Sequence, residues 1–377
     1  MNAPRWNEAR NILCVRLDNL GDVLMCTPAF RALKESLPGR RLTLLTSSAG
    51  ALLRDHLPEL DEVIDYAAPW VRQAAGQADA PEIAARLRAR RFDGAVIFTC
   101  FSQSPLPAAL LLHQAGIPLR LAHCRENPYA LLTDWVKETE PAEGIRHEVR
   151  RQLDLVAQVG ARSDNEALSF RLHGADIAAV RARLAAHGVS QPFVLMHPGA
   201  SAASRRWPAR HWSRAVELVY HELGHQVVLT GVASEAELVR DILTQAQVPP
   251  GAALPLAGAL SLGELGAAIA LAMVVLSNNS GPAHLSAALG TPIVDLYAQT
   301  NPQHTPWQVP QRVLFHDVPC RNCFRSECPE GHHACLERVE PEQAVAAIRE
   351  LVEEGGDPFG FSAPAQQAVV IPLHEAR

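Results

Sequence analysis

Lysine is almost absent from this sequence: Lys34 and Lys137 are the only two among 34 basic residues. Acidic residues number 40, and the net charge is −6. Up to Leu172 the 21 basic and 21 acidic residues balance, so the acidic excess lies entirely beyond that point. Because no domain is strongly basic, nothing in the composition suits a nucleic-acid backbone, and we expect no nucleic-acid partner.

Long apolar runs are missing as well. Nowhere do about 18 apolar residues follow one another, so no transmembrane helix is expected. The N-terminal stretch MNAPRWNEARNILCVRLDNLGD lacks the apolar core of a signal peptide. We therefore expect a cytoplasmic protein, whose eight cysteines serve as thiols or metal ligands rather than in disulfides.

Instead, short apolar runs alternate with amphipathic stretches of helical spacing. NILCVRL (11–17), FDGAVIFT (92–99) and FVLMH (193–197) are typical of buried parallel strands. This alternation predicts an α/β fold, and 377 residues suggest two domains. We place them at 1–172 and 173–355, followed by a loosely ordered tail over 356–377.

The stretch VVLSNNSGPAHL (274–285) joins a predicted strand to a predicted helix through small polar residues. The helix begins near Ser280 or Gly281, where free N–H groups and the helix dipole attract phosphate. His284 lies one turn further along. The alternative is an ordinary N-cap made by Asn279 or Ser280. From these residues alone both interpretations stay open.

A second loop of this kind follows the strand at 193–197. HPGASAASRRWP carries small residues, Ser201 among them, and then Arg205 and Arg206. A guanidinium can place two donors on a phosphate. The alternative is a solvated arginine pair beside a buried tryptophan. Neither G-x-G-x-x-G nor the P-loop motif occurs, so dinucleotide and P-loop interpretations lack specific support.

The stretch VRLDNLGDVLMCTP (15–28) places two carboxylates between a strand and a helix. Asp22 lies near the helix N-terminus, which favours its ionised form. An ionised carboxylate in a cleft between domains can take a proton from a substrate hydroxyl. The alternative is that Asp18 caps the helix and Asp22 stabilises its first turn.

Together these stretches resemble glycosyltransferase family 9, the ADP-heptose heptosyltransferases of lipopolysaccharide inner-core assembly. The resemblance runs from about Ile12 to Val345 and includes VRLDNLGDVLMCTPAFRAL, HEVRRQLDLVAQVG, RRWPARHW and VVLSNNSGPAHLSAALGTPIVDLYAQTNP. It implies two Rossmann-like doubly wound domains facing a cleft, which is the GT-B architecture. The N-terminal domain would bind the acceptor and the C-terminal domain the nucleotide-sugar donor.

The resemblance also implies roles for single residues. Asp22 would be the general base, and His123 and Arg125 would contact an anionic acceptor. The donor-binding residues would be Ser201, Arg205, Glu235, Asn279, Ser280, Gly281 and His284. The sequence departs from the family pattern at two of these: Arg205 replaces a lysine, and Asn279 replaces an aspartate that contacts the donor sugar.

Four cysteines crowd into one segment, at positions 320, 323, 328 and 335. Such density suits a structural zinc or iron ion held by Cys320, Cys323, Cys328 and Cys335. The alternatives are reduced thiols packing a compact loop, or a disulfide. Catalysis in this family needs no metal or other cofactor.

The expected activity is therefore an inverting transfer of heptose from ADP-heptose to a hydroxyl of a lipid-linked inner-core saccharide. The enzyme would act in the cytoplasm, with peripheral contact to the inner membrane. Two alternatives stay open at this point. One is a sugar-nucleotide 2-epimerase of the same architecture, and the other is a catalytically silent nucleotide-sugar binding protein.

Overall fold

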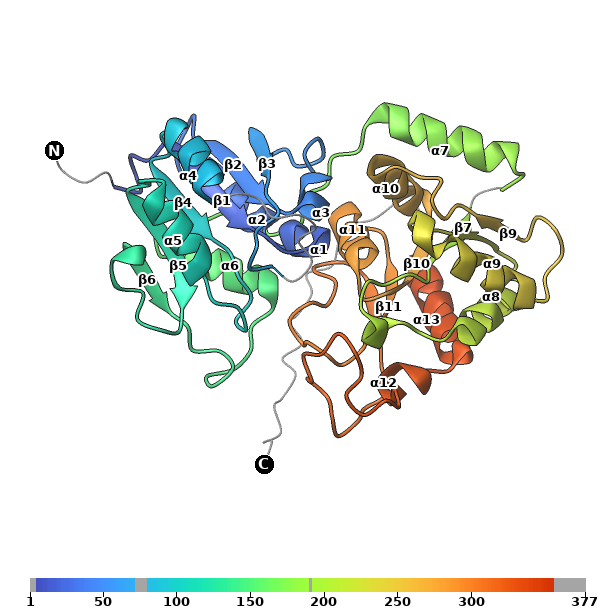
Figure 1. Ribbon diagram of the computed structural model, residues 1–377. Helices are drawn as coiled ribbons and strands as arrows, with labels where there is room; N and C mark the ends of the chain where they lie inside the picture. The colour runs from blue at the N-terminus through green and yellow to red at the C-terminus, as the bar shows by residue number, and fades with distance from the viewer. Residues whose placement is uncertain (1–4, 72–79, 190–191, 356–377) are drawn as a thin grey trace. The chain divides into compact units, whose positions relative to one another are not determined.

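The computed structural model describes residues 5–71, 80–189 and 192–355, so the tail expected at 356–377 lies outside the described residues. The chain divides into two compact units, Met1–Arg171 and Leu172–Arg377 (Figure 1). Each unit carries one six-stranded sheet, and the two units are described separately below.

Unit 1 is a fully parallel sheet with strand order β3-β2-β1-β4-β5-β6. Its strands are β1 Asn11–Arg16, β2 Arg41–Thr46, β3 Glu62–Asp65, β4 Gly94–Ile97, β5 Leu119–Cys124 and β6 Asp134–Lys137. Its helices are α1 Leu20–Leu24, α2 Thr27–Glu35, α3 Ser48–Ala51, α4 Ala80–Ala89, α5 Leu106–Gln114, the 3₁₀ turn η1 Tyr129–Leu131 and α6 Glu148–Ala157. Strands β1, β4 and β5 are buried along almost their whole length, as expected for central strands covered on both faces.

Unit 2 repeats this plan with strand order β12-β11-β10-β7-β8-β9, again fully parallel. Its strands are β7 Phe193–His197, β8 Gln226–Leu229, β9 Ala253–Pro255, β10 Val274–Asn278, β11 Ile293–Leu296 and β12 Gln311–Leu314. Its helices are α7 Gly174–Ala186, η2 Ala203–Arg205, α8 Ala209–Leu223, η3 Ala233–Glu235, α9 Ala236–Gln245, α10 Leu262–Leu271, α11 Gly281–Leu289, α12 Ala334–Glu337 and α13 Pro341–Glu354.

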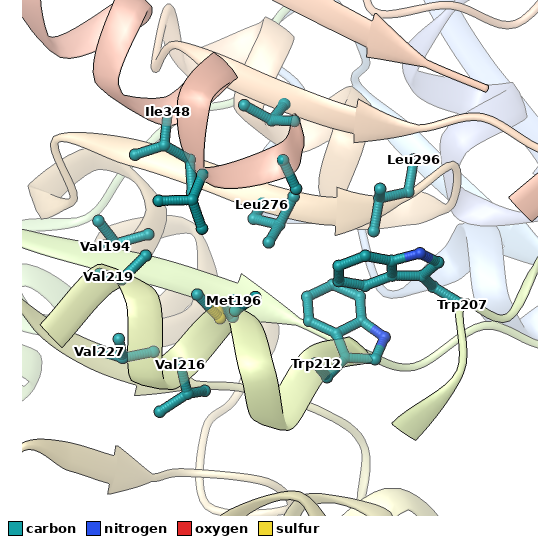
Figure 2. Packing of buried hydrophobic residues seen from close by; sticks show 14 of the residues in the cluster. Val194, Met196, Trp207, Trp212, Val216, Val219, Val227, Leu276, Leu296 and Ile348 are labelled. Carbon is teal, nitrogen blue, oxygen red and sulfur yellow. The ribbon is translucent and has the colours of Figure 1, made fainter. Parts of the chain in front are cut away.

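The core of unit 2 fixes the loop that follows β7. Helices α8 and α13 pack on the same side of the sheet, and Trp207 and Trp212 meet edge to face between them and the strands (Figure 2). The ring centroids lie 5.2 Å apart, a favourable aromatic geometry. The indole Nε1 of Trp207 also donates to the carbonyl of Val339 at 2.9 Å. The chain just before Trp207 is thereby held at the carboxyl end of the sheet.

Both units have the order of a doubly wound Rossmann sheet, in which the first strand lies between the second and the fourth. The direction of winding changes between β1 and β4 in unit 1, and between β7 and β10 in unit 2. Ligands of such sheets bind beyond the carboxyl ends of these strands. The predicted fold of two Rossmann-like α/β domains is confirmed.

Candidate active site

In unit 1, the end of β1 carries a guanidinium surrounded by carboxylates. Arg16 is fully buried and makes three ion pairs: Nε to Asp18 Oδ2 at 2.8 Å, Nη2 to Asp22 Oδ1 at 3.1 Å and Nη1 to Glu148 Oε1 at 2.6 Å. The sequence predicted that Asp18 and Asp22 lie close together at this end of the sheet. It did not identify Arg16 or Glu148 as their partners.

Asp22 is held in a fixed position at the first turn of α1. Its Oδ2 accepts a hydrogen bond from the backbone N–H of Asn19 at 3.1 Å, and its Oδ1 meets Arg16. The N-cap residue of α1 is Asn19, so the part of the alternative in which Asp18 caps this helix is wrong, whereas the part in which Asp22 stabilises its first turn is confirmed by the capping bond to Asn19. Asp18 instead accepts from Gln103 Nε2 at 2.7 Å. Burial raises the pKa of Asp18, with Asp22 and Glu148 adding to the rise and Arg16 opposing it.

The two residues predicted to contact an acceptor, His123 and Arg125, instead contact backbone carbonyls within unit 1. His123 is buried on β5, and its Nε2 lies 3.4 Å from the carbonyl oxygen of Arg151. Burial, together with the charge of Arg151, lowers the pKa of His123 to about 3, so the ring is neutral at pH 7. Arg125 donates to the carbonyls of Phe101 and Glu140, at 3.2 and 2.6 Å. Neither arrangement supports the predicted contact with an anionic acceptor.

In unit 2, one buried asparagine joins the two loops at the winding change. Asn278, the last residue of β10, donates from Nδ2 to the carbonyl of Pro198 at 2.7 Å. Its Oδ1 accepts from the backbone N–H of Trp207 at 3.1 Å. Pro198 and Trp207 bracket the loop after β7, which contains Ser201 and Arg205. The first of the two adjacent asparagines therefore positions the neighbouring loop.

Glu235 lies over a glycine of that loop. A Cβ atom at Gly199 would overlap the Glu235 carboxylate, and one at Gly231 would lie 3.0 Å from Oε2. The same Oε2 accepts from the N–H of Val232 at 2.9 Å and lies 4.0 Å from His197 Nε2. Burial lowers the pKa of His197 to about 4, so this histidine is neutral. Two glycines thus make room for a carboxylate beside the ends of β7 and β8.

The second asparagine faces the interior of the unit. Asn279 donates from Nδ2 to Asp295 Oδ2 at 2.9 Å and to the carbonyl of His304 at 2.8 Å. Asp295 is fully buried on β11, and burial raises its pKa to about 7, with Asn279 and the charge of Arg205 opposing the rise. Arg205 is half-buried, and among the described residues no carboxylate forms an ion pair with it. Its charge is therefore available at the loop.

The start of α11 differs from an ordinary capped helix. Ser280 occupies the N-cap position but makes no side-chain capping bond, and its hydroxyl donates to the carbonyl of Asn278 at 3.1 Å. The side chain of Asn279 is directed to Asp295 instead. Gly281 and Pro282 follow, and His284 is buried one turn on. Ser280 thus occupies the N-cap position, as one interpretation expected, but its side chain does not cap the helix, and binding of an anion at this N-terminus stays a prediction.

The cysteine-rich segment 320–335 is attached beside the same loops. Ser204 donates from its backbone N–H to Ser326 O at 3.0 Å and from Oγ to Arg325 O at 2.9 Å. Phe324 donates its N–H at 2.8 Å to the carbonyl of Thr300, which lies in the loop that follows β11. The segment therefore rests on the loops that follow β7 and β11.

The four cysteines of this segment are free thiols. Cys320 Sγ lies 3.8 Å from His332 Nε2, but within the described residues no three His, Cys, Asp or Glu side chains are arranged to hold a metal ion. The prediction of a site formed by Cys320, Cys323, Cys328 and Cys335 is therefore not supported. The backbone bonds made by residues 322–326 anchor the segment to its neighbours rather than around a common centre.

Two parallel six-stranded sheets of Rossmann strand order give this chain the GT-B fold of its structural neighbours, which are glycosyltransferases. The profile of glycosyltransferase family 9 (heptosyltransferase) matches residues 82–334, and the chain belongs to this family. Lipopolysaccharide heptosyltransferase 2 of Escherichia coli K12 is 25% identical over 350 residues, covering 90% of this chain and 98% of the relative.

Solved structures agree on the fold. A family 9 glycosyltransferase from Veillonella parvula superposes with a TM-score of 0.75 at 21% identity, covering 94% of this chain and all of that one. The ADP-heptose LPS heptosyltransferase II of E. coli gives 0.73 at 24% identity, covering 92% and 100%. In residues 5–71, 80–189 and 192–355, no helix combines the length and apolar character that crossing a membrane requires.

Sequence reasoning missed five residues that build the site: Arg16, Glu148, Gly199, Asn278 and Asp295. Some signals were present. An arginine at the end of an apolar strand is costly unless paired, and it marks a buried ion pair. Likewise, an aspartate inside the apolar run PIVDLYA indicates a buried acid with a specific partner.

Proposed function

We propose that this enzyme transfers a heptose from ADP-heptose to a hydroxyl of the lipopolysaccharide inner core, with inversion at the anomeric carbon. Lipopolysaccharide heptosyltransferases 2 and 3 are among its relatives, and this supports both the sugar and the pathway. The observation that carries the chemistry is the Asp22 carboxylate, fixed by Arg16 and by the Asn19 N–H at the winding change of unit 1.

Unit 2 would bind the donor. The N–H groups at the start of α11, with Ser280 and Gly281, would hold the diphosphate, and Arg205 would add a cation. Glu235 would accept hydrogen bonds from the ribose hydroxyls, since it is fixed over Gly199 and accepts from Val232. Ser201 is exposed on the same loop and would complete the cradle.

Unit 1 would bind the acceptor. The acceptor hydroxyl loses its proton to Asp22 as its oxygen forms a bond to the anomeric carbon. At the same time the bond from that carbon to the diphosphate oxygen breaks, and ADP leaves with the electron pair. Arg205 and the α11 N–H groups would stabilise the developing negative charge. A single displacement of this kind inverts the anomeric centre and needs no resident cofactor.

The acceptor in this proposal is lipid-linked, so the enzyme would work at the cytoplasmic face of the inner membrane through peripheral contact. The relatives that act on lipopolysaccharide or lipooligosaccharide support this placement by their names.

A binding panel followed by a transfer assay tests the proposal. ADP, UDP, GDP, CDP and NAD are titrated calorimetrically into wild type and Asp22→Asn, and ADP-heptose is then supplied with heptose-deficient core saccharide. We expect ADP to bind both proteins alike, and Asp22→Asn to transfer at least about 100-fold more slowly. Preferential binding of UDP would contradict the heptose assignment and favour an epimerase. Binding of ADP without transfer by wild type would indicate a silent binding protein.

A further inference from the structure

One buried glutamate lies far from Asp22 in sequence but acts on the same guanidinium. Glu148, the first residue of α6, is fully buried and meets Arg16 Nη1 at 2.6 Å, across 132 residues of sequence. The same Oε1 accepts from Gln152 Nε2 at 2.7 Å, and Gln152 Nε2 also donates to Thr99 O at 3.0 Å. Gln152 thereby links Glu148, on the same helix, to the backbone just beyond the end of β4.

The position of Glu148 favours its ionised form. A carboxylate in the first turn of a helix is stabilised by the helix dipole, and the ion pair with Arg16 adds to this. Arg16 has no exposed surface, so its orientation is set by its three carboxylate partners rather than by water. With Nη1 directed to Glu148, the Nε and Nη2 groups are presented to Asp18 and Asp22.

The charge of Arg16 is shared within this cluster. One guanidinium faces three carboxylates: Asp18 on the loop after β1, Asp22 on α1 and Glu148 on α6. The thiols of Cys26 and Cys100 also sense the cluster, and burial raises the pKa of both, so they stay neutral. If Arg16 paired with Asp22 alone, its positive charge would strongly lower the proton affinity of the Asp22 carboxylate. Because Arg16 is shared among three carboxylates, this lowering is partly offset.

We propose that Glu148 is a positioning residue for the transfer reaction: it orients Arg16 toward Asp22 and, by sharing the guanidinium charge, keeps Asp22 able to accept a proton. This inference rests on the proposed function, in which Asp22 is the base. In this proposal Glu148 touches no substrate, but it sets both the position and the basicity of Asp22, which does. Asp18 shares the second of these roles.

The test compares Glu148→Gln with wild type in two measurements. The first is the pH dependence of kcat/KM for heptosyl transfer. We expect its acid limb to move to lower pH by about one unit, and kcat to fall about tenfold, because one negative charge is removed beside Asp22. The KM for the donor should stay unchanged, since the donor residues lie in unit 2.

The second measurement needs no turnover. Carboxyl ¹³C chemical shifts of labelled aspartates are followed against pH, and the Asp22 signal is assigned through Asp22→Asn. The titration midpoint of the Asp22 carboxyl should move to lower pH in Glu148→Gln, and by a similar amount in Asp18→Asn, whose half-buried side chain is the easier one to replace.

Glu138→Gln is the matched control. Glu138 is also buried and pairs with Arg151 at 2.6 Å, but it forms no ion pair with Arg16. It should lower thermal stability without moving the acid limb. Glu148→Asp, which keeps the charge, should keep the wild-type limb.

If Asp22 titrates identically in wild type, Glu148→Gln and Asp18→Asn, the inference is wrong. If wild type itself transfers no heptose while the Asp22 titration moves as expected, the proposed function fails and the electrostatic role of Glu148 stands.

Discussion

The side-chain amide of Asn279 donates one hydrogen bond to the buried Asp295 carboxylate at 2.9 Å and a second to the carbonyl of His304 at 2.8 Å. Both N–H bonds of the amide are thereby taken up. Toward any further group the side chain can act only as an acceptor. For a ligand at this position Asn279 would therefore offer only its carbonyl oxygen, and the nearby Asp295 carboxyl lies on the neighbouring strand β11.

The Asp295 carboxyl should make stability depend on pH. Burial raises its pKa from 3.8 to about 7 in the folded protein, so the folded state binds the proton more tightly than the unfolded chain. Stability from this group is complete below about pH 4 and is lost as pH rises through about 7. Asp295→Asn should remove this dependence.

Relative to wild type, the free energy of unfolding of Asp295→Asn should therefore gain about 2–3 kcal/mol between pH 5 and pH 8. Urea unfolding at several pH values measures this. Asp241→Asn, on the exposed surface of α9, is the control and should follow wild type. A parallel pH dependence of wild type and Asp295→Asn would show that Asp295 is ionised in the folded protein throughout this range.

Gly199→Ala should damage donor binding more than folding. The new methyl group would overlap the Glu235 carboxylate, which lies at the end of a flexible side chain and can turn away. We expect ADP affinity to fall about tenfold or more, as for a lost hydrogen bond to a charged group, with little change in melting temperature. Gly174→Ala, where a Cβ meets nothing within 4 Å, is the control and should bind ADP normally.

Asn278→Ala should loosen the two loops together. It leaves the buried N–H of Trp207 and the carbonyl of Pro198 without their partner. The free energy of unfolding should fall by about 2–4 kcal/mol, and ADP should bind more weakly. Chemical unfolding and calorimetry measure both effects. Unchanged stability together with unchanged ADP affinity would mean that the loops are held by other contacts.

Arg205→Gln should weaken ADP binding by about 10- to 100-fold and reduce its dependence on salt, because a charge-assisted contact to the diphosphate is lost. Arg205→Lys should recover part of the affinity, since the charge remains. Arg210→Gln is the control, because it removes an exposed arginine of α8 that pairs with Glu337 of α12. Equal ADP affinity in Arg205→Gln and Arg210→Gln would remove Arg205 from the donor site.

The sequence was informative where local pattern decides structure. The strands at 11–17, 193–197 and 274–278 were recognisable as apolar runs, whereas ligand binding by the loops after them stays a prediction. Strand β5 was missed because Arg120 and His123 interrupt its apolar pattern. Arg120 is tolerated there only because its guanidinium donates to backbone carbonyls, including those of Leu131 and Ala130, from the neighbouring η1 turn.

The edge strands and the long-range partners could not be predicted from the sequence, because both depend on contacts between distant segments. β3, β9 and β12 are short, and their identity depends on the strand beside them. Similarly, Asp22 could be proposed from its loop, but its link through Arg16 to Glu148 follows from strand order and from where α6 packs. Propensity and spacing describe neighbours in sequence, whereas these contacts are set by topology.

The strand order also has a consequence for how the enzyme is made. In unit 1, β1 must pair with β4, joining Ile12 to Gly94, before the loops beyond them can meet. In unit 2, Val194 must likewise join Val274. Such distant pairings form slowly, after the local helices. We therefore expect the loops beyond the central strands of each unit to take their final positions only late in folding.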